Sequence, residues 1–172
     1  MHGGRVMTKL TYHEFAPEDF DAMMALASDW DIVRQLGRWA WPADPEQVRF
    51  YCIPFNGDGL NWTIKENGVF AGRIGVTSGN LGYTLAKFAH GRGIATAASV
   101  FAITQAFDLL GLSEITGSTW VDNPASARVL QKLGFVHWQT HYQYARARRI
   151  PTIVHQHRLT RSAWDRLRAA DK

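Results

Sequence analysis

Residues 81–96 read LGYTLAKFAHGRGIAT and join a predicted strand to a predicted helix through a glycine-rich turn. Several backbone N–H groups at such a helix start lack partners, and the helix dipole adds partial positive charge there. Gly91 and Gly93 would let phosphate oxygens approach the backbone, because no Cβ lies in the way. The stretch therefore favours a pyrophosphate site, although an ordinary glycine-rich turn explains the same residues equally well.

Two other phosphate-binding patterns are excluded by their spacing. A P-loop requires Gly, four residues and then Gly-Lys-Ser/Thr, and the sequence contains no such run. A dinucleotide-binding fingerprint requires a third glycine near Thr96, within an early strand–helix–strand unit. Here the turn comes in the middle of the chain, after a predicted antiparallel meander.

The neighbouring sequence extends this stretch in both directions. Strands are predicted before it over residues 62–65, 70–77 and 81–85, with turns at Asn67-Gly68 and Gly79-Asn80. A long helix is predicted after it, from Ile94 to Leu110, and Gly111 should end that helix. Four apolar residues at helical spacing should form its buried stripe, namely Val100, Ile103, Phe107 and Leu110.

The remaining elements complete an α+β (mixed α/β) pattern. Pro17 and Pro45 should each open a helix near the start of the chain, and a further helix is predicted over residues 124–133. The other predicted strands cover residues 9–15, 115–120, 135–142 and 152–159. This order predicts a mixed sheet with helices on both faces.

The overall composition sets the broad class. A length of 172 residues predicts a single domain over residues 1–172, in which residues 1–7 could be a flexible lead-in. The formal charge of +4 and the pI near 9.5 suit a polyanionic ligand. The C-terminal excess of arginine is more typical of a solvated face than of a nucleic-acid surface, since no RNA-binding motif accompanies it.

Cysteine content and hydropathy predict the compartment. Cys52 is the sole cysteine, which points to a reducing environment and to a buried side chain rather than a nucleophile. Neither a signal peptide nor a membrane-spanning run is evident. We therefore expect a cytoplasmic protein.

Two motifs resemble those of the GNAT superfamily of acetyl-CoA-dependent N-acetyltransferases. His90-Gly91-Arg92-Gly93-Ile94-Ala95 is similar to the family motif Gln/Arg-x-x-Gly-x-Gly/Ala, with histidine at the first position. The run NPASARVLQKLGF over residues 123–135 is similar to its second signature. The resemblance extends from Lys9 to about Leu167. It is closest to the ribosomal-protein N-terminal acetyltransferases, which residues 39–42 and 159–164 also resemble.

The resemblance implies a mostly antiparallel twisted sheet of about seven strands, splayed between the fourth and fifth, with a site for acetyl-CoA. The resemblance also implies a role for three residues of this chain. The backbone N–H near Leu85 would stabilise the oxyanion, Asn123 would contact the pantetheine arm, and Ser126 would donate to or orient the departing sulfur. The residues implied to bind the cofactor are Leu85, Ala86, His90, Gly91, Arg92, Gly93, Ile94, Ala95, Thr96, Asn123 and Ser126. Asn123 could instead cap the following helix, and Arg92 could be a solvated residue at a helix start.

The acceptor side is less well defined by the sequence. The resemblance implies an acceptor cleft lined by four aromatic residues, namely Trp30, Trp39, Trp41 and Phe55. At least half of these side chains should instead fill the core. The two positions where relatives carry an acid hold Asn80 and Ala97. Candidates for the general base are Glu14, Glu66, Glu114, His137 and His141, each of which is more often a structural residue. Water could serve a weakly basic α-amine, whose pKa is about 8.

The sequence thus predicts transfer of an acetyl group from acetyl-CoA to a primary amine, in a ternary complex and without a metal. The amine could be a protein N-terminus or a small molecule. Two alternatives stay open: a degenerate acyl-CoA-binding or regulatory module, and a basic RNA- or ribosome-associated protein. A homodimer is compatible with the sequence.

Overall fold

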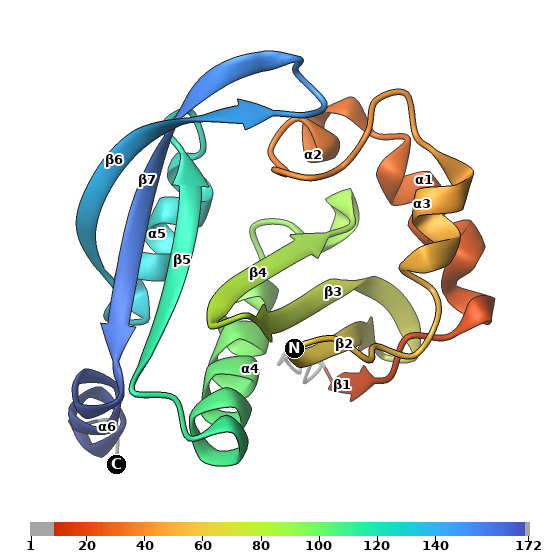
Figure 1. The fold of residues 1–172 in the computed structure, drawn as a ribbon. Helices are drawn as coiled ribbons and strands as arrows, with labels where there is room; N and C mark the ends of the chain where they lie inside the picture. The colour runs from red at the N-terminus through yellow and green to blue at the C-terminus, as the bar shows by residue number, and fades with distance from the viewer. Residues whose placement is uncertain (1–8, 171–172) are drawn as a thin grey trace, which may run out of the picture.

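A computed structural model describes residues 9–170, and the predicted lead-in at residues 1–7 lies outside the described residues. The strands form one sheet of seven, in the order β1-β2-β3-β4-β5-β7-β6. The sheet is strongly twisted, as Figure 1 shows. All neighbouring strands are antiparallel except β4 and β5. The strands are β1 Leu10–His13, β2 Gly59–Glu66, β3 Val69–Thr77, β4 Asn80–Leu85, β5 Glu114–Trp120, β6 Val136–Ala145 and β7 Ile150–Thr160.

Helices cover both faces of this sheet, which confirms the predicted α+β class. The α-helices are α1 Phe20–Ala27, α2 Trp30–Val33, α3 Pro45–Phe50, α4 Ile94–Leu110, α5 Pro124–Lys132 and α6 Arg161–Ala170. Short 3₁₀ turns occur at Pro17–Asp19 (η1) and Lys87–Ala89 (η2). The largest core lies between β2–β5 and helices α4–α6, while α1 and α3 enclose a second core. Cys52 is buried in this second core, as predicted.

The splay between β4 and β5 is present. The two strands pair only at Asn80–Thr116 and Leu81–Gly117, where Asn80 Nδ2 also donates to Thr116 Oγ1 at 3.0 Å. Beyond these pairs the strands diverge, as Figure 1 shows. Residues 82–85 of β4 therefore do not pair with residues 118–120 of β5, and this interruption of the sheet is here called the slot.

Helix α4 has the predicted bounds but a different buried stripe. Ile103 and Phe107 are buried as expected, whereas Val100 is only partly buried and Leu110 is 37% exposed. Fully buried alanines take their place, namely Ala98, Ala102 and Ala106. Small side chains let the helix axis approach the sheet closely, so a stripe chosen by the largest apolar residues was partly wrong.

Several boundaries also differ from the predictions. The second hairpin turns at Ser78-Gly79, where both residues have positive φ, and Asn80 already belongs to β4. β2, β6 and β7 are longer than predicted. Helix α6 was not predicted, although its Trp164 is buried on the core and Leu167 packs beside it at the i+3 position.

The corrected stripe gives a test of the fold. Phe107→Ala should lower the free energy of unfolding by about 3–5 kcal/mol, because it empties a fully enclosed site. Leu110→Ala, on the same helix, should cost less than about 1 kcal/mol. Urea denaturation measures both values, and equal losses would contradict this packing of α4.

Candidate functional site

The alternation of β4 assigns its side chains to two different surfaces. Leu81, Tyr83 and Leu85 point to the side covered by α4 and α5, here called the α4 face. On the other side of the sheet, Thr84 of β4 lies opposite Arg73 of β3, and Arg73 lies opposite Thr63 of β2. The Thr63 hydroxyl donates to the carboxylate of Asp19, just before α1, at 3.0 Å. This second side is called the α1 face. The interrupted pairing of β4 with β5 lies between these two faces.

The glycine turn lies at the start of α4. Gly91 and Gly93 adopt φ of 70° and 78°, and a Cβ built at either position would have nothing within 4 Å. Ala97 donates to Gly93 O at 3.0 Å, and no side chain caps the helix. The preceding N–H groups therefore have no acceptor in the first turn, which is the arrangement that binds phosphate oxygens.

Leu85 ends β4 at the edge of the slot. The next residue, Ala86, donates to Ala71 O of β3 at 2.9 Å. Because successive residues of a strand direct their polar groups to opposite sides, the N–H of Leu85 is directed toward the β5 side. His90 Nε2 donates to Leu85 O at 3.0 Å and so ties the glycine turn to this strand end.

Asn123 and Ser126 lie together at the start of α5. Asn123 Oδ1 accepts from Ser126 N at 3.1 Å, so Asn123 caps the helix. Ser126 Oγ lies 2.7 Å from the hydroxyl of Tyr83, which the sequence analysis did not identify. Burial raises the pKa of Tyr83 above its ordinary value, so its phenol is neutral at physiological pH. A buried tyrosine between Leu81 and Leu85 needs a hydrogen-bond partner, and that signal could have identified it.

Arg92 does not point into the turn. Its guanidinium forms a bidentate ion pair with Glu66, which is only 5% exposed, at 2.6 and 2.5 Å. This contact fixes the turn against β2 and also occupies Glu66, one of the candidate bases. Arg92 thus has a structural role here, beyond the contribution of its backbone to the turn.

The four predicted acceptor-cleft residues fall into three places. Trp30 and Trp41 lie side by side, with ring centroids 5.2 Å apart. Trp39 is buried and stacks on Tyr51 in the second core. Phe55 lines a different pocket of about 150 Å³, along β2, together with Glu14. The structure thus groups Trp30 with Trp41 and separates the other two.

A hydrogen-bonded network around Asp122 holds residues 34–41, here called the segment after α2, next to the end of β5 that does not pair with β4. Arg148 donates to both carboxylate oxygens of Asp122 at 3.0 and 2.9 Å and to Arg34 O at 2.6 Å, and Arg34 also contacts Asp122. Hydrogen bonds from Arg148, with the positive charges of both arginines, hold the pKa of Asp122 below its ordinary value. A Cβ at Gly37 would lie 4.0 Å from the Trp120 ring, which places this segment next to the slot.

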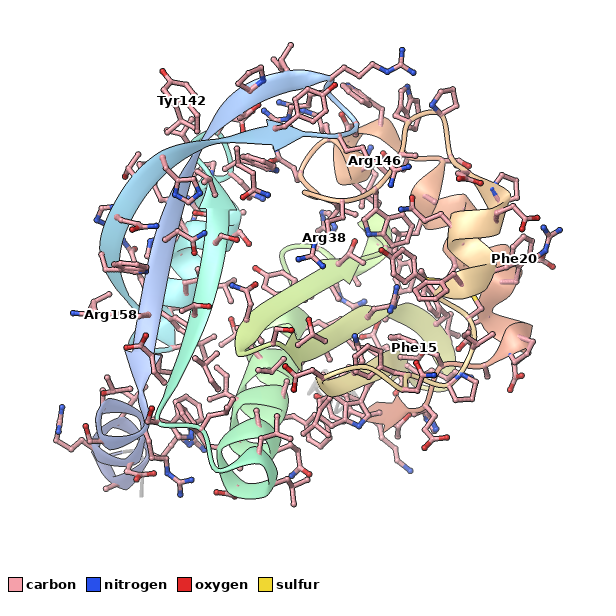
Figure 2. All side chains as sticks on the ribbon, in the orientation of Figure 1. Phe15, Phe20, Arg38, Tyr142, Arg146 and Arg158 are labelled. Carbon is pink, nitrogen blue, oxygen red and sulfur yellow. The ribbon has the colours of Figure 1, made fainter. Side chains whose placement is uncertain are left out.

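A pocket of about 300 Å³ lies between this segment and the β6–β7 hairpin. Its lining residues are Ala40, Trp41, Tyr144, Arg146 and Arg149. Figure 2 shows Arg146 and Arg38 in this region, between the hairpin and β4. Trp41 is the one predicted acceptor-cleft residue that lines it.

The remaining candidate bases are scattered. Glu114 begins β5 at the closed end of the slot. His137 hydrogen-bonds to Thr140 and lies beside His155 and His157. Of the two histidines, only His141 shares a face of the sheet with Trp120. His141 on β6 and Trp120 on β5 both lie opposite Val154 of β7. Ala97 is exposed, and Asn80 is bonded to Thr116.

Two further properties concern residues 9–170. Within this range, no group of three or more His, Cys, Asp or Glu side chains could hold a metal ion. No helix in the described part of the chain is long and apolar enough to cross a membrane.

Solved structures share this fold at low sequence identity. A GNAT-family acetyltransferase from Bacillus anthracis is 15% identical over 88% of this chain and 94% of its own, with a TM-score of 0.72. Spermidine N-acetyltransferase from Vibrio cholerae, in complex with CoA and spermine, is 16% identical over 90% and 97%, with a TM-score of 0.72. Mycobacterium smegmatis RimJ, in complex with CoA-disulfide, is 18% identical over 94% and 89%, with a TM-score of 0.74.

These likenesses establish the fold, and the family follows from the sequence. No curated protein matches the chain. The profile of the acetyltransferase (GNAT) domain matches residues 9–136, most of the chain. With the splayed sheet and the glycine turn in place, the chain belongs to the GNAT acetyltransferase family.

Proposed function

We propose that this acetyltransferase moves an acetyl group from acetyl-CoA to a primary amine that enters from the α1 face. The open glycine turn at the start of α4, next to a slot through the sheet, is the observation that carries the proposal. N–H groups of residues 91–96 would hold the pyrophosphate, and strand β4 along the slot would pair with the amides of the pantetheine arm. Acetyl-CoA supplies the activated acetyl group as a thioester.

The residues around the slot can stabilise charge as acyl transfer proceeds. The N–H of Leu85 is directed into the slot, where it would donate to a developing oxyanion, a contact typically worth about 3 kcal/mol. The hydroxyl of Tyr83 would donate a hydrogen bond to Ser126 Oγ. The hydroxyl hydrogen of Ser126 would then be directed at the leaving sulfur, with Asn123 fixing the start of the helix.

The acceptor is proposed to be an α-amine rather than a lysine side chain. Glu66 is paired with Arg92, and the two family positions for an acid hold Asn80 and Ala97, so within residues 9–170 no carboxylate base is evident beside the slot. An α-amine with a pKa of about 8 is partly neutral at physiological pH and needs little assistance, whereas a lysine amine at about 10.4 needs more. The resemblance to ribosomal-protein N-terminal acetyltransferases supports the same choice.

The two alternative functions have less support. A binding module without turnover would explain the missing acids, but it would not require Tyr83 and Ser126 to meet at the slot. An RNA-binding surface needs free basic groups near the C-terminus. Two of these groups are engaged in ion pairs, Arg148 with Asp122 and Arg161 with Asp108 and Asp165, whereas Arg146 and Arg149 form none within residues 9–170.

A paired glycine substitution tests the phosphate site. Gly93→Ala should weaken CoA binding roughly tenfold or more, because a Cβ there lies in the phosphate approach and disfavours the positive φ. Gly68→Ala is the matched control, since Gly68 also has positive φ and open space but lies in the β2–β3 turn. Both variants should lose about 1–2 kcal/mol of stability. Calorimetric titration with CoA would contradict the site if both variants bound it equally well.

Substitutions at Tyr83 and Ser126 test the proton path. Ser126→Ala should lower kcat on the order of 100-fold and leave CoA affinity unchanged, because the leaving sulfur loses its donor. Tyr83→Phe keeps the ring in the core and should lower kcat by less. The double variant should be no slower than Ser126→Ala, since the two hydroxyls act in series. Thiol release measures each rate, and strictly multiplicative losses would refute the coupling.

A further inference from the structure

The pocket beside Trp41 carries positive charge that the structure does not neutralise. Arg146 Nη1 donates to Arg38 O at 3.4 Å, and Arg149 Nη2 donates to Trp41 O at 3.2 Å. Both guanidinium groups thus contact uncharged carbonyl oxygens. Among residues 9–170, neither they nor Arg38 form an ion pair, and all three side chains are exposed.

Several carboxylates on the surrounding segments are already occupied, and Asp44 caps α3 by accepting from Glu46 N. Asp122 is shared by Arg34 and Arg148, so one negative charge faces two positive ones. Asp29 and Asp31 both contact Lys87. Glu46 contacts Arg49. The pocket therefore has a local excess of cations that a ligand, and not the chain, would balance.

The α1 face carries a further buried cation near the slot. Arg73 is 8% exposed and lies opposite Thr84 of β4. Its guanidinium lies over the rings of Phe15 and Tyr51, at 3.8 and 4.5 Å from their centroids, and its Nε has no hydrogen-bond partner. Burial lowers the pKa of Arg73 to about 10, so it is still charged at neutral pH. Arg73 thus adds one more positive charge to the α1 face.

The pocket is placed to contact an acceptor beyond its amine. Arg148, between Arg146 and Arg149 in sequence, lies over the ring of Trp120 at 5.6 Å, at the open end of β5. An extended peptide spans about 3.3–3.6 Å per residue. A peptide whose amine enters the slot would pass Trp120 and Arg148, so its following residues would extend toward the hairpin.

We infer that the acceptor is an acidic peptide, whose carboxylates after the N-terminal residue bind in the pocket lined by Ala40, Trp41, Tyr144, Arg146 and Arg149. This rests on the proposed transfer to an α-amine and adds a substrate class to it. Arginine binds carboxylates through two parallel N–H groups, and Trp41 and Tyr144 offer apolar surface to the side-chain methylenes. Polyamines and aminoglycosides would be repelled by the same charges.

Matched peptides test the inference. Three acceptors share Ser at the first position and carry Glu, Gln or Lys at positions two to four. The Glu peptide should have a kcat/KM roughly tenfold above that of the Gln peptide, with the Lys peptide and spermidine lower still. The difference should lie in KM and should shrink as salt rises, since exposed charge pairs are screened.

Charge-removing variants locate the effect. The double substitution of Arg146→Gln with Arg149→Gln should abolish the preference for Glu over Gln, because neither peptide then meets a cation from the hairpin. Arg166→Gln is the control for net charge, because Arg166 is exposed on α6, at the opposite end of β7 from the hairpin. Arg146→Lys with Arg149→Lys keeps the charge and should retain part of the preference. Thermal melting verifies that each variant is folded.

The outcomes separate the two proposals. Equal turnover of the three peptides would overturn the acidic-acceptor inference while leaving N-terminal acetylation intact. A preference for Glu that survives in the double Gln variant would also overturn it. If no amine is acetylated, the proposed function fails. Binding of the three peptides, followed by tryptophan fluorescence, would then decide the pocket assignment, and tighter binding of the Glu peptide would support it.

Discussion

The incomplete pairing of β4 with β5 is the constraint on which the rest of the structure depends. Two residue pairs and the Asn80–Thr116 hydrogen bond hold these strands together at one end, and beyond that point they diverge. Backbone polar groups left unpaired between two strands require other partners. A site for a ligand with its own amide groups is therefore created by the sheet, before any side chain contributes.

This slot also divides the chemistry between two surfaces. On the α4 face, Tyr83, Ser126 and the glycine turn gather beside the helix starts. On the α1 face, Thr84, Trp120 and the arginines of the hairpin lie beneath the segment after α2. The strict alternation of one short strand, β4, separates these two groups of residues. In the proposed reaction, the acyl donor and its acceptor would therefore approach from different surfaces.

Ion pairs decide which charges are available on each side. Arg92 neutralises Glu66 and anchors the glycine turn. The Glu66 carboxylate is therefore not free to accept a proton. Arg148 and Arg34 neutralise Asp122 and anchor the segment over β5. Both pairs leave the site poor in acids and rich in cations, which is why the proposed acceptor is weakly basic at its amine and acidic beyond it.

The sequence by itself determined the features that local backbone geometry requires. Positive φ at Gly91 and Gly93, the Asn123 cap and the bounds of α4 depend on a few adjacent residues, so the family, the sheet and the place of the glycine turn were predicted. Contacts between distant segments were decided only by tertiary packing. Tyr83 meets Ser126 across 43 positions, and Phe55 is separated from Trp41, because register and helix placement bring such residues together or apart.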